Sequence, residues 1–392
     1  MMLRRNIRTI AWLSAYLLLA CISTALGQQQ VIGQDTARRP ILTAVPFLTI
    51  APDSRSSAMG DVGVALSADA NSAHWNIGKL AFIDSDMGAS ISFSPWLATL
   101  VDDMYVTYLS GYTKVQEGRY VSASLRYFDL GSMDFTDDQG AITRSFNPRE
   151  FAASVSYSMK LSERFGMGLS ARFIHSNLAG SFTNSTGDSR PANSASVDIG
   201  AFYENDEMSL GNLPSTLRLG AQISNLGIKM TYSDESQRDF LPSNLRVGGA
   251  WTAEFDGFNS LTFAFDINKL LVPTPPVRDG QQIIAGKDPD RNLLSGALGS
   301  FADAPDGFQE EMRELIFATG VEYWYNDLFA ARAGYFHEHE LKGARQYFTF
   351  GAGLRFTKFG LDVSYLLARK QNHPLENTLR FTLMVDLDKT AE

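Results

Sequence analysis

The side chains that could do chemistry in this 392-residue chain are few and lie far apart. His337 and His339 stand two positions apart, a spacing that would put both imidazoles on one face of a strand as a possible metal pair. We interpret them instead as a solvated strand end, because an external loop is predicted to follow. No G-x-S-x-G nucleophile motif occurs in the chain. We therefore expect no catalytic site, no cofactor and no metal.

Cysteine chemistry is limited as well, because Cys21 is the single cysteine and lies in a predicted export leader. Three arginines precede an apolar run over residues 10–24, and a small-x-small cleavage motif ends at Gly27. We predict a signal peptide over residues 1–27. A lipoprotein signal at Cys21 and an uncleaved membrane anchor are the alternatives.

The charge balance argues against a nucleic-acid partner. The formal net charge is −9 at pH 7, and loss of the three leader arginines takes it to −12. An acidic surface repels phosphate, so we expect no nucleic acid among the partners.

Alternation of apolar and polar residues organises most of the chain after the leader. About fourteen segments of roughly nine to eleven residues alternate with period two, and that length lets a tilted strand cross a bilayer. Short connections alternate with long ones, of which the longest covers residues 270–314. This arrangement predicts an all-β fold, a transmembrane antiparallel β-barrel of the outer membrane. We expect its short turns and both termini to be periplasmic and its long loops extracellular.

Seven arginines fall on the polar faces of these segments. An arginine that faces lipid near the midplane costs roughly 2–4 kcal/mol, so we predict that all seven point into the barrel. There they would pair with acidic side chains and leave little open lumen. These residues are Arg126, Arg172, Arg218, Arg246, Arg332, Arg355 and Arg380.

The stretch over residues 46–82 does not alternate. Small residues, glycines and single polar groups interrupt its short apolar pieces, so it has little means of burying a hydrophobic face alone. We predict a plug inside the barrel, after a flexible lead-in over residues 28–45 and before a barrel domain over residues 83–392. The motif residues of this plug are Arg55, Met59, Gly60, Asp61, Trp75 and Asn76.

The longest loop carries apolar residues at helical spacing after a stiff proline-rich start. Leu294, Leu298 and Phe301 predict a short amphipathic helix outside the membrane. Its apolar side chains either pack on the barrel as a lid or form a docking surface for another protein, and the sequence leaves both open. The candidate partner-binding residues are Leu294, Leu298, Phe301 and Phe308.

The predicted plug also resembles the opening of the PorV family, outer-membrane proteins of the type IX secretion system in Bacteroidetes that are related to FadL-like barrels. Relatives commonly follow the last asparagine of the motif with Pro-Ala, whereas Ile77-Gly78 stand here. The resemblance rests on Pro46-Phe47-Leu48, Asp53-Ser54-Arg55, Ala58-Met59-Gly60-Asp61 and Ser72-Ala73-His74-Trp75-Asn76.

The resemblance implies a non-enzymatic cargo shuttle. Such a protein binds the C-terminal signal domains of secreted cargo, receives the cargo from a translocon barrel of the Sov or SprA type, and delivers it to a sortase-like attachment complex of the PorU type. Membrane lipid and lipopolysaccharide would surround it. Two alternatives are a FadL-like channel for hydrophobic small molecules and a lipopolysaccharide O-deacylase, for which the sequence offers no clear catalytic residues.

Overall fold

The computed structural model describes residues 38–388, apart from 99, 138, 179, 181, 185–186, 234–237 and 371–374. The predicted signal peptide and most of the lead-in lie outside the described residues. The described residues from Arg39 onwards form one compact unit.

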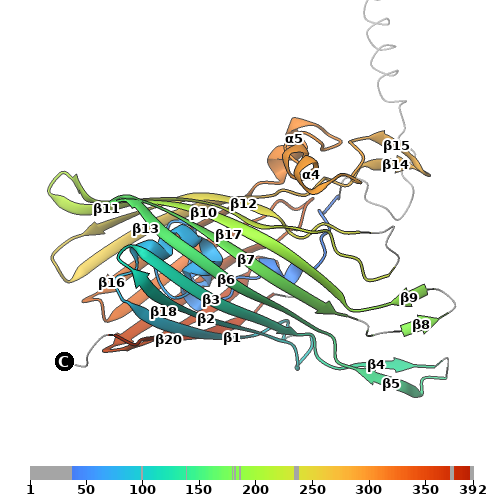
Figure 1. Ribbon diagram of the computed structural model, residues 1–392, viewed down its shortest axis with the longest axis horizontal. Coiled ribbons are helices and arrows are strands. Elements are labelled where there is room, and N and C mark those ends of the chain that lie inside the picture. Colours follow the sequence, from blue (N-terminus) through green and yellow to red (C-terminus); the bar gives the residue numbers. More distant parts are fainter. Residues whose placement is uncertain are drawn as a thin grey trace, which may run out of the picture. The chain divides into compact units, whose positions relative to one another are not determined.

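Fourteen antiparallel strands close into a barrel (Figure 1), which confirms the predicted fold class. The first and last of them pair with each other, so the sheet has no free edge. The strands are β1 (Met87–Pro95), β2 (Tyr105–Gln116), β3 (Arg119–Asp129), β6 (Arg149–Ser162), β7 (Phe165–Asn177), β10 (Ala192–Leu210), β11 (Leu213–Gly227), β12 (Asn244–Glu254), β13 (Asn259–Leu270), β16 (Ile316–Tyr325), β17 (Phe329–His337), β18 (Gln346–Phe356), β19 (Phe359–Ala368) and β20 (Leu379–Asp386).

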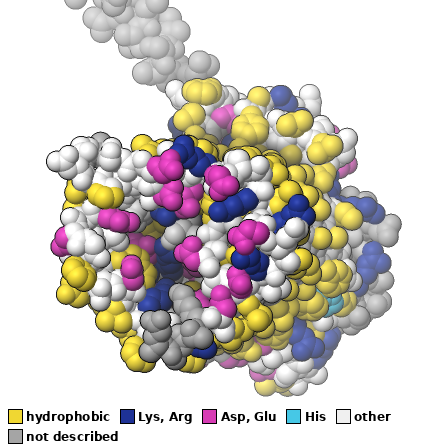
Figure 2. Space-filling model, turned by 60° about the vertical axis from the view of Figure 1, so that its left-hand side comes forward, with side chains coloured by type: hydrophobic (Ala, Val, Ile, Leu, Met, Phe, Trp, Pro, Cys, Tyr) yellow, Lys and Arg dark blue, Asp and Glu magenta, His cyan; other side chains and the backbone are white. Residues whose placement is uncertain are grey.

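Exposure alternates along the strands as the period-two pattern predicts. In β13, Phe263 and Phe265 are exposed on the outer wall, whereas Ala264 and Asp266 are buried inside. Figure 2 shows a largely hydrophobic outer wall, with charged side chains gathered at the barrel end that faces the viewer. An apolar outer wall on a closed barrel is what a lipid environment requires, because every backbone polar group is then paired within the sheet.

The long connections contain elements that lie together at one end of the barrel (Figure 1). We call this the long-loop end, and the opposite end, with tight connections such as Glu117-Gly118, the short-turn end. Three hairpins there were not predicted, because their strands are too short to show alternation. The elements are β4 (Met133–Thr136) with β5 (Ile142–Phe146), β8 (Phe182–Asn184) with β9 (Gly187–Ser189), β14 (Val277–Asp279) with β15 (Gln282–Ala285), and the helices α4 (Leu293–Gly299) and α5 (Phe308–Arg313).

Among the described residues, no helix is long and apolar enough to cross a membrane.

Residues 46–82, which we call the inner segment, lie inside the ring of strands (Figure 1). From Ala51 to Leu66 every residue is buried except Asp61. The backbone forms only short helices, joined by irregular stretches. These are η1 (Pro46–Thr49), α2 (Ser54–Ser57), α3 (Ser72–Trp75) and η2 (Ile77–Phe82).

The described ends of the chain lie at opposite ends of the barrel. At the long-loop end, the Arg39 amide donates a hydrogen bond to the Leu341 carbonyl at 3.1 Å. At the short-turn end, the Leu387 amide donates to the Met87 carbonyl at 2.9 Å. The described part of the chain therefore begins at the long-loop end and finishes at the short-turn end, while the termini, which we expect to be periplasmic, lie outside the described residues. The described ends differ in position because the inner segment traverses the lumen once before β1 begins.

Candidate functional site

Side chains of the barrel wall hold the backbone of the inner segment. Asp266 Oδ2 on β13 accepts hydrogen bonds from the amides of Gly63 at 2.8 Å and Val64 at 3.0 Å. Gln222 Oε1 on β11 accepts one from the Ile77 amide at 2.9 Å. Buried backbone groups need such partners where no regular helix or sheet supplies them. The wall thus replaces the hydrogen bonds that the irregular segment lacks.

The two charged residues of the predicted motif bridge directly to the wall. Arg55 donates from Nε and NH2 to the Glu322 carboxylate on β16, at 2.9 and 2.8 Å. This is a bidentate, buried pair, the strongest type of charged hydrogen bond. Asp61 Oδ2 accepts a hydrogen bond from the Tyr347 hydroxyl on β18 at 2.5 Å.

Of the neighbouring motif residues Trp75 and Asn76, one hydrogen-bonds within the inner segment and the other hydrogen-bonds to the wall. Asn76 Nδ2 donates to the Ala201 carbonyl on β10 at 2.9 Å and so reaches the wall. Trp75 Nε1 donates to Asp53 Oδ1 at 2.5 Å, which joins two turns of the inner segment to each other. Trp75 meets the wall only through its ring, over which the Arg246 guanidinium lies at 4.4 Å.

Met59 and Gly60 lie where the wall strands carry no side chain. A Cβ added at Gly320 or Gly334 would overlap the backbone of Met59. The Gly60 amide donates to Thr349 Oγ1 at 2.8 Å. These wall glycines were not predicted from the sequence. They could have been recognised because a glycine at an inward-facing strand position often marks the close approach of another backbone.

The seven strand arginines all lie on the lumen side and fall into two groups. Four have carboxylate partners: Arg172 with Asp198, Arg218 with Glu204, Arg332 with Glu322 and Asp362, and Arg355 with Asp362. Three, within the part of the chain that the structure describes, have none: Arg126, Arg246 and Arg380.

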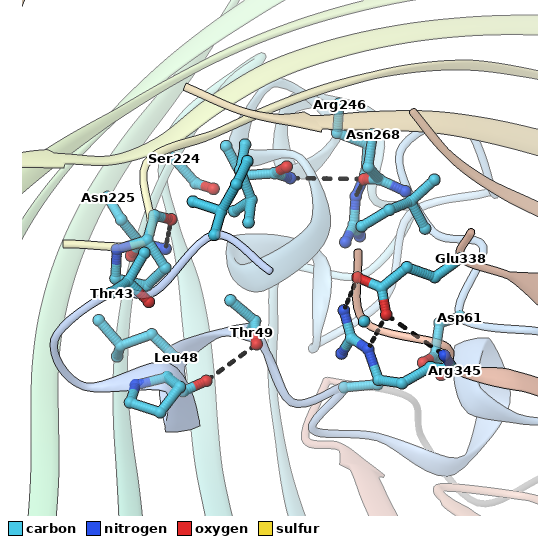
Figure 3. Close-up of a pocket in the computed structure, with 18 of the residues that line it drawn as sticks. Thr43, Leu48, Thr49, Asp61, Ser224, Asn225, Arg246, Asn268, Glu338 and Arg345 are labelled. Atoms are coloured by element: carbon cyan, nitrogen blue, oxygen red, sulfur yellow. Dashed lines mark hydrogen bonds and ion pairs between the residues drawn. The ribbon is translucent and has the colours of Figure 1, made fainter. Parts of the chain in front are cut away.

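A cavity of about 270 Å³ lies between η1 and the strands β11, β12 and β13 (Figure 3). On one side Arg246 covers Trp75, and its Nε donates to Asn268 Oδ1 at 2.5 Å. On the other, Arg345 Nε donates to Glu338 Oε2 at 2.7 Å. The lining is therefore charged and rich in amides as well as apolar, which fits a polar ligand better than a hydrocarbon.

The longest loop is fixed to the barrel by buried charges. Glu310, Glu311 and Glu314, on and just after α5, are all buried. Lys269 Nζ at the end of β13 donates to Glu311 at 3.0 Å and to Glu314 at 2.7 Å. Lys342 Nζ donates to Glu310 at 2.7 Å and to Glu314 at 2.8 Å. We call this set, together with Arg39, the loop anchor.

Arg39 adds the lead-in to the loop anchor. Its Nε donates to Glu310 Oε1 at 3.0 Å and its NH2 to Glu310 Oε2 at 2.8 Å. Burial raises the pKa of Glu310, but the hydrogen bonds from Arg39 and Lys342 outweigh this effect and lower the pKa to about 2. The carboxylate is therefore ionised across the physiological range.

Four large apolar residues in the second half of the longest loop are exposed, although the ring of Phe301 also lies 5.6 Å from Lys269 Nζ at the end of β13. The helix predicted there is present as α4, but it ends at Gly299 and so does not include Phe301. Its small residues Gly296 and Ala297 are the buried ones, so the large side chains do not form a lid. We call the exposed set the apolar patch: Leu294 at 63%, Leu298 at 77%, Phe301 at 50% and Phe308 at 78% exposure.

The two histidines considered as a metal pair lie at the end of a strand and in the loop that follows it. His337 is the last residue of β17, and His339 Nδ1 accepts a hydrogen bond from the Leu341 amide at 3.2 Å in the following loop. Among the described residues, no group of three or more His, Cys, Asp and Glu side chains could hold a metal ion.

Comparison with solved structures shows the fold. The Pseudomonas putida toluene transporter TodX has a TM-score of 0.50 and 11% identity, covering 88% of this chain and 98% of that chain. A Pseudomonas aeruginosa FadL homologue has a TM-score of 0.45 and 11% identity, covering 89% and 99%. No curated protein matches the chain.

Comparison with family models gives a more specific result. The model described as "Type IX secretion system protein PorV" matches residues 33–277, which is more than half of the chain. The closed barrel with its apolar outer wall is an outer-membrane barrel. The chain belongs to the PorV family of type IX secretion system proteins.

Proposed function

We propose that this protein binds the C-terminal signal domain of secreted cargo and carries it from the translocon barrel to the cell-surface attachment complex. Family membership supports a role in type IX secretion. The partners in this proposal are a translocon barrel of the Sov or SprA type, a sortase-like complex of the PorU type, and the cargo signal domains. No catalytic step is part of it.

The apolar patch is the observation that carries the proposal. Large exposed apolar side chains gathered on one surface of a folded protein usually mark an interaction site. Here they stand on a loop whose opposite side is held by the buried loop anchor. Because these contacts already fix the loop, binding of a partner would cost little of the loop's conformational entropy.

The orientation of the barrel is also part of the proposal. Outer-membrane barrels place short turns in the periplasm and long loops outside the cell. With that orientation, α4, α5 and the apolar patch project from the cell surface, where cargo is handed over.

A channel for hydrophobic small molecules is the second candidate, and the fold shared with TodX is what favours it. The lumen lining weakens this candidate. Arg246, Glu338 and Arg345 border the cavity of Figure 3, and a hydrocarbon offers such groups no hydrogen bond.

Co-purification from membranes in mild detergent tests the proposal. We expect the combined change Leu294→Ser, Leu298→Ser and Phe308→Ser to abolish recovery of secreted cargo and of the large translocon barrel, because it removes the apolar contact area. Normal heat-modifiable mobility on a gel would show that the barrel still folds.

The matched control is the change Phe255→Ser with Phe258→Ser. These two aromatic residues are also exposed, but they lie in the turn between β12 and β13 at the short-turn end. The control should keep full recovery. Equal recovery by both variants, or recovery of lipid alone by the unaltered protein, would contradict the proposal.

A further inference from the structure

A second cavity, of about 260 Å³, also borders η1 at the long-loop end of the lumen. It shares Asp61 and Arg345, both labelled in Figure 3, with the first cavity. Trp96 and Leu375, which belong to connections at the long-loop end, are half-buried in its wall. A small molecule could therefore reach it from that end.

Arg380 on β20 lines this second cavity and has no acceptor. The residue is only 3% exposed, and no described residue accepts a hydrogen bond from its guanidinium. Its Nε is fully buried without a partner, and the nearest ring, of Trp96, lies 5.9 Å away. Arg332, buried to a similar degree, instead donates to two carboxylates. A buried cation without an acceptor is strongly unfavourable, so the cavity must supply one.

The rest of the cavity wall is mainly apolar. Phe47, Phe128 and Leu366 are buried along it, and Ile50 is partly buried. Water would satisfy the guanidinium but gain nothing from these side chains, whereas a molecule with a short carbon chain would bury apolar surface. Arg345 pairs with Glu338. Asp61 accepts from Tyr347 through Oδ2, whereas its Oδ1 is buried without a hydrogen-bond partner among the described residues.

We propose that this cavity binds a small organic anion whose charged group accepts hydrogen bonds from Arg380 and whose carbon chain packs against Phe47 and Leu366. A planar guanidinium can donate two parallel bonds to a carboxylate or to a phosphate oxygen pair. The cavity volume limits the ligand to a few carbon atoms beyond that group. This site is separate from the apolar patch and from any cargo bound there.

Titration calorimetry of the purified full-length barrel in detergent micelles tests the proposal, with hexanoate as the probe and hexanol as its neutral counterpart. We expect saturable binding of hexanoate and at least tenfold weaker binding of hexanol. Arg380→Gln should weaken hexanoate binding by about tenfold to a hundredfold, as expected for loss of charged hydrogen bonds. Arg380→Lys should keep part of the affinity. Arg278→Gln, an exposed change of the same charge, should keep all of it.

Because Arg380→Gln could fail to fold, Ile50→Trp provides a second variant. It fills the cavity and keeps the arginine, so it should also abolish binding. The proposal is overturned if hexanol binds as tightly as hexanoate, if Arg380→Gln and Arg278→Gln behave alike, or if Ile50→Trp binds normally. Displacement of hexanoate by chloride at ordinary salt concentration would likewise overturn it, since the site would then hold an adventitious ion only.

Discussion

The inner segment and the longest loop sort their side chains in opposite ways. In the inner segment, apolar residues such as Met59, Trp75 and Leu80 are buried against the wall. In the longest loop, the carboxylates of Glu310 and Glu314 are buried, while the large apolar side chains of the apolar patch stand in solvent. Both regions are fixed to the same barrel, but only the loop keeps its hydrophobic surface free.

This difference indicates what each region is built to do. Buried apolar surface, backbone hydrogen bonds and the buried Arg55–Glu322 pair together hold the inner segment in the barrel. The loop is held mainly by the buried charges of the loop anchor, which leave the side chains of the apolar patch exposed. A surface meant to bind another protein needs this second arrangement.

The largest effect should come from breaking the fit of the inner segment with Gly334→Ala. The added methyl group would overlap the backbone of Met59, which cannot move because the wall surrounds it. We expect failure of assembly or a loss of more than about 3 kcal/mol of stability, beyond ordinary overpacking. The thermal midpoint of heat-modifiable gel mobility measures it.

Gly111→Ala is the matched control for Gly334→Ala. Gly111 also lies within a barrel strand, but a Cβ there would meet its nearest neighbour at an ordinary 3.6 Å. Its midpoint should stay within a few degrees of the unaltered protein. Equal midpoints for the two variants would show that the inner segment does not press on the wall.

A more local effect, confined to the longest loop, should follow from Lys342→Met in the loop anchor. It leaves Glu310 and Glu314 buried with one fewer cation, and breaking a buried pair from one side costs about 3–5 kcal/mol. We expect faster amide hydrogen exchange in residues 293–313 with no change in the barrel strands. Lys370→Met breaks an exposed pair with Glu340. It should change the free energy of local opening, as measured by hydrogen exchange, by less than about 1 kcal/mol. Unchanged exchange in the loop of Lys342→Met would disprove the anchor.

Acid should release the longest loop from the barrel. The pKa of Glu310 is lowered to about 2 in the folded loop, below its ordinary value of 4.5. A carboxylate whose pKa is lowered on folding stabilises above its ordinary pKa and loses this contribution as the pH falls towards the folded value. Protection factors in residues 293–313 should therefore be constant above about pH 4.5 and fall between pH 4.5 and 2. In Glu310→Gln they should already be low at pH 7, and a loop equally protected at pH 3 and pH 7 would refute this account.

The barrel was predictable because its signals are local. Alternation with period two is visible in each strand, and the high energy of an arginine in lipid fixes which face points inward. The inward positions of Arg172, Arg332 and Arg380 follow from this argument. The inner segment was recognisable too as a non-strand stretch, since its glycines and small residues break the alternation.

The features that the sequence did not reveal depend on contacts between distant positions. Arg39 and Glu310 are 271 positions apart, and no local pattern links them. The spacing of Leu294 and Leu298 predicts one face of a helix but not whether that face points to the barrel or to solvent. That direction is set by the buried loop anchor on the other side. Likewise, nothing in residues 46–82 tells from which end of the barrel the segment enters.

Photo-crosslinking in living cells tests most directly whether the apolar patch is the surface that meets the secretion partners. A benzophenone amino acid at position 298, on α4, should give adducts that contain secreted cargo or the large translocon barrel. The same group at position 258, at the short-turn end, should give neither. Adducts with lipid or lipopolysaccharide alone at position 298, or the same protein adducts at both positions, would contradict the account.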